Sequence, residues 1–225
     1  MSKKAKVLVA MSGGIDSTVA ALMLHKEGYE VIGITMKTWD YATSNAKGKE
    51  TGCCNIDSFN DARLAAVNNG FPHFILDIRE EFGDFVIENF VDEYLAGRTP
   101  NPCVMCNTHI KWRALLKRAD ALGCEFIATG HYAKVRIHTN GRYVISKGLD
   151  ATKDQSYVLW GVDQELLSRT ILPLGGLHKK DIRQMAIDWG YPELAKKSES
   201  YEICFVPDND YRGFLKRRVP GLEEK

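Results

Sequence analysis

A glycine-rich segment near the N-terminus has the residues of a phosphate-binding loop. Residues 12–17 read Ser-Gly-Gly-Ile-Asp-Ser, between a short apolar run and a segment whose apolar residues recur at helical spacing. A glycine turn at such a junction places unpaired backbone N–H groups at a helix N-terminus, where the helix dipole also favours anions. The segment lacks the Gly-Lys-Ser/Thr of a Walker A motif and the G-x-G-x-x-G of dinucleotide-binding folds. It therefore predicts phosphate binding of another kind.

Two cysteines follow a proline-containing turn, a setting that suits nucleophilic chemistry or metal binding. Residues 98–107 read Arg-Thr-Pro-Asn-Pro-Cys-Val-Met-Cys-Asn, and a helical pattern begins directly after them. A helix N-terminus lowers the pKa of a nearby thiol and raises its thiolate fraction. We therefore expect a reactive sulfur at Cys106. The C-x-x-C spacing of Cys103 and Cys106 by itself fits zinc, redox and iron-sulfur sites alike.

The other cysteines give weaker signals. Cys53 and Cys54 are adjacent, and neighbouring residues seldom both ligate one metal. Cys124 lies at the edge of an apolar run, which predicts a buried and inert thiol. Cys204 lies in the apolar, strand-like run 200–206, where an inert core cysteine fits the pattern as well as a reactive one.

The composition indicates a soluble cytosolic protein. The chain has 225 residues, of which 44% are hydrophobic, enough for one substantial core. Its first apolar run, 7–10, is too short for a signal peptide or a membrane span, so the cysteines indicate thiol or metal chemistry rather than disulfides. The net charge of +1 leaves nucleic-acid binding open. The lysine and arginine clusters at 179–180, 196–197 and 216–218 are candidates for a basic face or for ordinary solvated surface.

Strand and helix signals alternate along the chain and predict the frame that holds these residues. This alternation is typical of an α/β fold with a doubly wound, mostly parallel sheet, here with a small helical extension. Gly130-His131 would then lie at the carboxyl edge of the sheet, where ligands bind, although His131 also fits a helix cap or a buried imidazole. The predicted strands are 7–11, 30–36, 74–77 and 125–129, the helices are 18–26, 57–69, 79–95, 108–122, 154–167 and 179–189, a hairpin pairs 132–136 with 142–146 around Asn140-Gly141, and 37–55 and 96–107 are irregular.

Several motifs together resemble the tRNA-specific 2-thiouridylases. Residues 12–17 resemble the PP-loop of the ATP pyrophosphatases, which split ATP between its α and β phosphates, and the resemblance runs from residue 5 to about 215. It implies an adenine nucleotide alpha hydrolase-like fold, and an enzyme that uses ATP, Mg²⁺ and a sulfur-donor protein to place sulfur at C2 of the wobble uridine of tRNA. The other matching motifs are 97–102 with Cys106-Asn107, Ala128-Thr129-Gly130-His131-Tyr132, 153–157 and 203–205.

The resemblance implies a role for each matching residue. The uridine C2 oxygen would be joined to AMP, which makes it a good leaving group, and Cys204 would carry a persulfide while Cys106 acts as nucleophile. The loop would hold pyrophosphate, with Asp16 near Mg²⁺. The ATP-binding residues would be Ala10, Met11, Ser12, Gly13, Gly14, Ile15, Asp16, Ser17, Met36 and Gly130, the target base would meet Asn101, Pro102 and Cys103, and the tRNA would meet Lys153, Asp154 and Gln155.

The chain departs from this family in two places. Cys103 stands where well-known members commonly have aspartate, so Cys103, Cys106 and Cys204 could instead ligate a [4Fe-4S] cluster that carries the sulfur. The chain also ends at Lys225, whereas family members continue into largely β domains. We therefore expect a PP-loop catalytic domain over 1–200 and the truncated start of a central domain over 201–225.

Two other functions are consistent with parts of the sequence. Another PP-loop enzyme, such as a lysidine synthetase or a different tRNA thiolase, would share the loop but not the surroundings of Cys106 and Cys204. A non-catalytic nucleotide-binding or metal-sensing module would bind zinc through the cysteines and form no AMP.

Overall fold

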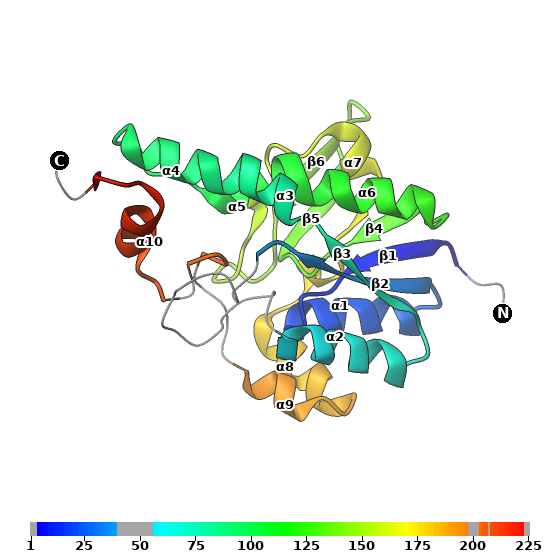
Figure 1. Cartoon of the computed structure of the whole chain (residues 1–225). Coiled ribbons are helices and arrows are strands. Elements are labelled where there is room, and N and C mark those ends of the chain that lie inside the picture. The colour runs from blue at the N-terminus through cyan, green and yellow to red at the C-terminus, as the bar shows by residue number, and fades with distance from the viewer. Residues whose placement is uncertain (1–3, 40–55, 198–202, 207, 223–225) are drawn as a thin grey trace.

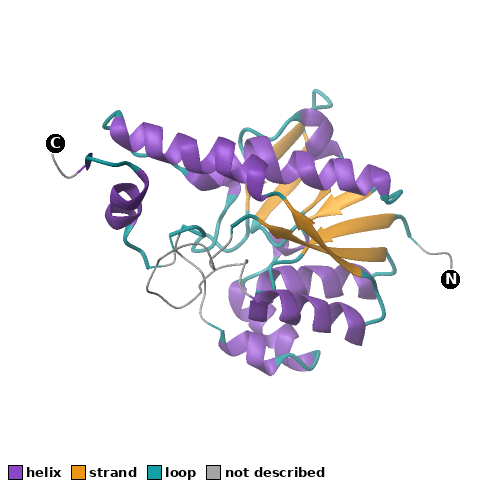
Figure 2. Cartoon of the chain, viewed as in Figure 1, coloured by secondary structure: helices purple, strands orange, loops and turns teal. Residues whose placement is uncertain are grey.

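A parallel β-sheet forms the centre of the molecule. In the computed structural model, which describes residues 4–39, 56–197, 203–206 and 208–222, five strands pair in the order β3-β2-β1-β4-β7, and every pair is parallel. Helices cover both faces of the sheet (Figure 1, Figure 2), which confirms the predicted doubly wound α/β class. The strands are β1 (Lys6–Ala10), β2 (Glu30–Lys37), β3 (His73–Asp77), β4 (Phe126–Ala128) and β7 (Thr170–Ile171).

The alternation of side chains along β1 divides the core between the two faces of the sheet. Leu8 joins the hydrophobic cluster under α3, α4 and α6, whereas Val7 and Val9 join the cluster under α1 and α2. Figure 1 shows these two helical layers above and below the strands. The helices are α1 (Ile15–Lys26), α2 (Ile56–Asn68), α3 (Arg79–Phe82), α4 (Glu88–Leu95), α5 (Pro102–Met105), α6 (Trp112–Ala121), α7 (Gln164–Ser168), α8 (Lys179–Asp188), α9 (Pro192–Lys196) and α10 (Tyr211–Arg218), with π-helical segments at Gly83–Ile87 and Cys106–Lys111 and 3₁₀ turns at Ser156–Val158 and Pro173–Gly176.

The strand order of the sheet reverses beside β1, and this switch point is where a ligand is expected to bind. β1 pairs with β2 on one side and with β4 on the other, so that Val9 lies opposite both Gly33 and Ala128. Open α/β sheets bind their ligands outside the carboxyl ends of strands at such a switch point. The two segments that leave this edge are the glycine-rich loop after β1 and residues 129–131 after β4.

A separate antiparallel hairpin follows β4. β5 (Ala133–Ile137) pairs with β6 (Tyr143–Lys147), with Val135 opposite Ile145, which confirms the hairpin predicted from Asn140-Gly141. Gly141 has a φ of 80°, the left-handed conformation that this turn requires.

The predicted helix over 154–167 is wrong. The chain forms only the 3₁₀ turn Ser156–Val158 and the short helix α7 there. The carboxylate of Asp154 accepts hydrogen bonds from the backbone N–H groups of Gly148 and Ser156, and such local side-chain bonds compete with helix formation.

Two further boundaries differ from prediction. The helix expected from residue 108 begins at Pro102, because the Asn101 side chain accepts the N–H of Val104 at 3.2 Å and proline suits the first turn. The described part of the expected strand 200–206, residues 203–206, forms a turn instead. There the ring of Phe205 is buried 5.2 Å from that of Phe90 and 5.4 Å from that of Phe214 in α10.

Candidate active site

The glycine-rich loop is held in shape by its own serines. The hydroxyl of Ser17 accepts the N–H of Ser12 at 3.0 Å, lies 3.1 Å from the Ser12 hydroxyl, and donates to the carbonyl of Gly14 at 3.2 Å. Gly13 has a φ of 74°, which favours glycine. Gly14 caps α1 without a side-chain hydrogen bond, so the first N–H groups of this twelve-residue helix face the loop as an anion site requires.

A pocket opens at the switch point above this loop. It is lined by three segments, namely the end of β1 with the loop, the end of β2 and the turn 129–131, and by two single residues, Lys111 and Gln155. Seven of the predicted ATP-binding residues line it, namely Ala10, Met11, Ser12, Asp16, Ser17, Met36 and Gly130, and the remaining lining residues are Thr35, Thr38, Lys111, Thr129, His131 and Gln155.

Gly130 approaches the start of α1 too closely for any side chain. A Cβ at this position would lie 2.8 Å from the backbone N of Ser17 and 2.9 Å from the carbonyl carbon of Asp16. The turn after β4 is thus packed against the loop after β1. Backbone groups rather than side chains form this wall of the pocket.

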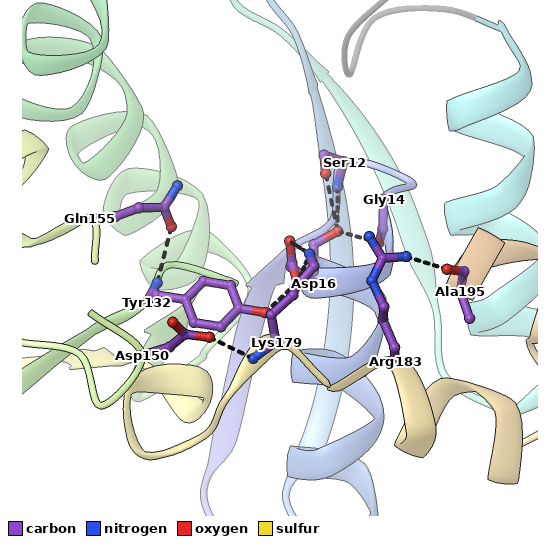
Figure 3. Close-up of polar contacts among 10 residues, drawn as sticks. Ser12, Gly14, Asp16, Tyr132, Asp150, Gln155, Lys179, Arg183 and Ala195 are labelled. Carbon is purple, nitrogen blue, oxygen red and sulfur yellow. Dashed lines mark hydrogen bonds and ion pairs between the residues drawn. The ribbon is translucent and has the colours of Figure 1, made fainter. Parts of the chain in front are cut away.

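Lys179 forms an ion pair with the loop residue Asp16. Its ammonium group lies 2.7 Å from both carboxylate oxygens, and the hydroxyl of Tyr132 donates to Oδ1 of the same carboxylate at 2.7 Å (Figure 3). Only 8% of Lys179 is exposed, so it is not part of a solvated basic pair. In the sequence, the Lys179-Lys180 pair is typical of a surface, and only the fold reveals the contact of Lys179 with Asp16.

Asp150 and α8 fix the position of Lys179. The Asp150 carboxylate accepts the backbone N–H of Lys179 at 3.0 Å and both the N–H and the hydroxyl of Thr152. These hydrogen bonds, with that of Lys179 the largest cause, lower the pKa of Asp150 to about 2. A Mg²⁺ ion beside Asp16, as predicted, would share its carboxylate with this fixed ammonium group.

His131 is held as a neutral imidazole at the pocket. Burial, together with the nearby cation of Lys111, lowers its pKa to about 3. Its Nδ1 lies 2.7 Å from the hydroxyl of Thr129, and its ring centroid lies 5.4 Å from that of Trp112. The side chain can therefore offer a neutral ring nitrogen or its face to a ligand, but not a positive charge.

A polar chain from β3 supports the residue that precedes the loop. The Thr35 hydroxyl donates to the carbonyl of Met11 at 2.7 Å and lies 2.8 Å from Nε2 of His73. Burial, followed by the charge of Arg63, lowers the pKa of His73. The residue that follows β1 is thereby connected to Thr35 of β2 and, through it, to His73 of β3.

The two predicted catalytic cysteines belong to one hydrophobic cluster. Cys106 is 8% exposed inside it, and the half-buried Cys204 packs against it. Cys106 lies in the second turn of the helical run that begins at Pro102, not at its N-terminus as expected, and begins a π-helical segment, a feature frequent at functional sites. Cys124 is buried with a raised pKa, as predicted for an inert thiol, and Cys53 and Cys54 lie outside the described residues.

The alternative of an iron-sulfur cluster finds no ligand set in the structure. Across residues 4–39, 56–197, 203–206 and 208–222, no three His, Cys, Asp or Glu side chains gather in a way that could hold a metal ion. Cys103 is exposed on the first turn of α5, whereas Cys106 turns into the core. The residues present therefore do not fit a cluster held by Cys103, Cys106 and Cys204.

The residues predicted to meet tRNA fall into two groups. Asn101, Pro102 and Cys103 begin α5, where Asn101 is the helix cap. In the loop before Ser156–Val158, the side chain of Asp154 organises the backbone, and that of Gln155 faces the nucleotide pocket and accepts the N–H of Tyr132 at 3.0 Å. Lys153 lies in the same loop.

The basic clusters proposed from sequence are largely paired with acids. Lys196 lies 2.9 Å from Glu193, Lys197 contacts Asp61, and Arg217 lies 3.2 Å from Asp208. Together with the burial of Lys179, these pairs argue against the clusters as a continuous basic face.

Fold and site together define an α/β domain of the PP-loop type, with a glycine-rich turn at the switch point of a doubly wound sheet and without a Walker lysine. The family described as "tRNA methyl transferase HUP domain" matches residues 5–208, and the chain belongs to this family. None of the helices that the structure describes is long and apolar enough to cross a bilayer.

Curated relatives are similar over the whole chain. A protein named tRNA-specific 2-thiouridylase MnmA from Cytophaga hutchinsonii is 72% identical over 225 residues, which are 100% of this chain and 61% of the relative. One of the same name from Amoebophilus asiaticus is 70% identical over 223 residues, 99% of this chain and 59% of the relative. The chain thus spans about 60% of the length of these relatives.

A solved structure described as a 4-thiouridine synthetase–RNA complex with bound ATP shares the fold. It superposes with a TM-score of 0.54 at 20% identity, over 98% of this chain and 52% of that one. At this identity the likeness shows the fold alone.

Proposed function

We propose that this chain is the catalytic part of a tRNA-uridine 2-sulfurtransferase, which uses ATP to activate the C2 oxygen of a wobble uridine and replaces it with sulfur. The observation that carries the proposal is the pocket at the switch point, whose lining includes Ser12, Asp16 and Ser17 of the loop together with Met36 and Gly130. The relatives named tRNA-specific 2-thiouridylase support the substrate and the reaction. Because tRNA is the substrate, we place the reaction in the cytosol.

In this proposal the loop and its surroundings bind ATP with its pyrophosphate at the N-terminus of α1. The N–H groups of the loop and the cations of Lys111 and Lys179 oppose the negative charge of the phosphates. Mg²⁺, when bound, supplies further charge neutralisation between the phosphate oxygens. The uridine oxygen attacks the α phosphate, pyrophosphate leaves, and the oxygen later departs with AMP when sulfur attacks C2.

We further propose that the sulfur comes through Cys204 and Cys106. A sulfur-donor protein leaves a persulfide on Cys204, its terminal sulfur attacks C2, and Cys106 forms a disulfide with Cys204 as the sulfur is released. Their shared hydrophobic cluster supports this assignment, since it places both segments against one core. The turn 101–103 would hold the base, and the loop 153–155 would contact the tRNA.

The test is a single-turnover assay with the chain, unmodified tRNA, ATP and a sulfur-donor protein that carries a persulfide, which measures AMP and thiolated tRNA. We expect both products from the unsubstituted chain. Cys106→Ser should abolish thiolated tRNA while ATP still binds, and Cys124→Ser, a substitution at the inert thiol, should retain thiolation. Thiolation by the Cys106 variant at the unsubstituted rate would refute the assignment.

A further inference from the structure

The β5–β6 hairpin carries positive charge without any negative charge. Residues 133–147 contain four cations and no aspartate or glutamate. Arg136, Arg142 and Lys147 are exposed, and Lys134 is half-buried. A segment of this kind attracts polyanions, because nothing within it neutralises the field.

These cations lack the close acidic partners that some other surface cations have. Arg79, for example, lies 2.6 Å from Asp77, and Arg98 lies 2.6 Å from Glu93. In the part of the chain that the structure describes, the hairpin cations form no ion pair. Arg136 donates a hydrogen bond to the Ser146 hydroxyl. Lys147 lies near Asp154, whose carboxylate accepts hydrogen bonds from Gly148 and Ser156. The charge on the hairpin is therefore available to a ligand.

An exposed tryptophan lies beside the hairpin. Trp160 is 74% exposed, although tryptophan is normally among the more buried residues. With His138 and Arg142 of the hairpin, it lines a groove of about 700 Å³ between β6 and α7, which lie next to each other in Figure 1. Asp163 is the acidic residue of the groove, and Arg113 pairs with it at 3.0 Å.

The groove is rigidly connected to the candidate active site. The side chain of Asn107 donates to the carbonyl of Val158 at 3.3 Å, and a Cβ at Gly161 would lie 2.4 Å from the Thr108 hydroxyl, so the segment that carries Trp160 packs on the helix of Cys106. The hairpin is also connected to the site, because β5 begins directly after Tyr132, whose hydroxyl donates a hydrogen bond to Asp16. The hairpin and the segment of Trp160 are therefore both joined directly to elements of the candidate active site.

We propose that the hairpin and Trp160 form a second RNA-binding surface, which contacts the tRNA beyond the target uridine. Arg136 and Arg142, which lie on one face of the hairpin, contact phosphates, and an unstacked base of the same tRNA stacks on Trp160 in the groove. The combination of unpaired cations and an exposed aromatic ring favours RNA over an acidic protein, which would need only the charge. This inference rests on the proposed function, since it takes tRNA as the ligand.

The test compares tRNA binding by the 225-residue chain and its variants over a range of salt concentrations. In the variant Arg136→Gln/Arg142→Gln, the slope of log K against log salt should become shallower by about 1.4, because each lost phosphate contact removes ~0.7. Trp160→Ala should weaken binding at least about fivefold at every salt concentration, as loss of a stacked base does. ATP binding should stay unchanged in both variants.

The matched control removes two cations that are already paired. Arg79→Gln/Lys196→Gln changes the net charge equally and should leave the slope unchanged. Equal slopes for both double variants, or full affinity in Trp160→Ala, would overturn the second surface while leaving the proposed function intact. Absence of tRNA binding by the unsubstituted chain would overturn both. Loss of polyglutamate binding in the hairpin variant with tRNA binding retained would assign the surface to an acidic protein and refute the proposal.

Discussion

The ammonium group of Lys179 lies 2.7 Å from both carboxylate oxygens of Asp16, although 163 positions separate the two residues in the chain. Asp16 stands in the glycine-rich loop and Lys179 begins α8, so this pair joins the start of the fold to its helical extension. It also brings a fixed positive charge to the proposed pyrophosphate site. The same ion pair should therefore affect both the stability of the loop and the charge at the proposed pyrophosphate site.

The first prediction concerns this pair. Lys179→Met should lower the free energy of unfolding by roughly 2 kcal/mol, because it leaves the Asp16 carboxylate without its ammonium partner, and should slow AMP formation at least about tenfold. Urea unfolding and AMP release measure the two effects. Lys180→Met, at the exposed neighbour, is the matched control and should change neither. Asp16→Asn/Lys179→Met should recover part of the lost stability; no recovery would mean that the pair is not the cause.

The second prediction concerns Gly130. Gly130→Ala should weaken ATP binding by about tenfold or more, because the added Cβ would meet the backbone of Ser17 at 2.8 Å and displace the loop. Titration of ATP by calorimetry measures this effect. Gly176→Ala provides the control, since a Cβ there meets open space. Equal ATP affinity in both variants would contradict the proposed contact between the two turns.

The sheet and the loop could be predicted from sequence because their signals are local. A β-branched run, a glycine turn and a helical pattern within about twenty residues determine β1, the loop and α1. Lys179 could not be assigned in this way, because its partner lies far away in the chain and its neighbour Lys180 makes the pair look like solvated surface. β7 has only two residues and carries no periodicity to detect.

The cysteine site shows the same division between local and long-range information. The Asn-Pro-Cys turn marks a helix start, but the sequence did not show that the helix begins at Pro102 and carries Cys106 into its buried second turn. The membership of Cys106 and Cys204 in one cluster depends on the packing of Phe205 between α4 and α10, which no spacing in the sequence encodes.

The third prediction concerns thiol accessibility. In the native protein, N-ethylmaleimide should modify Cys103 rapidly, since it is exposed, and should modify Cys124 at least about tenfold more slowly, since that thiol is buried and its pKa is raised. Peptide mass spectrometry over a time course gives both rates. In urea the two rates should converge. A native Cys124 rate equal to that of Cys103 would contradict the packing of the β4 edge.

The last prediction uses the pKa of His131, which is about 3 in the folded chain against about 6.5 in the unfolded chain. Because the folded state resists protonation, stability is fully present above pH 6.5 and falls as the pH is lowered from there toward 3. Between pH 7.5 and 5.5 this residue should account for a loss of about 1 kcal/mol in the free energy of unfolding.

His131→Gln, which keeps a hydrogen-bonding group for Thr129 but does not titrate, should lose correspondingly less over the same range. His73, whose pKa is also lowered, contributes equally in both proteins and cancels in the comparison. Identical pH dependence of urea unfolding in the two proteins would show that His131 is protonated as easily in the folded chain as in the unfolded one, and would remove the argument that it meets its ligand as a neutral ring.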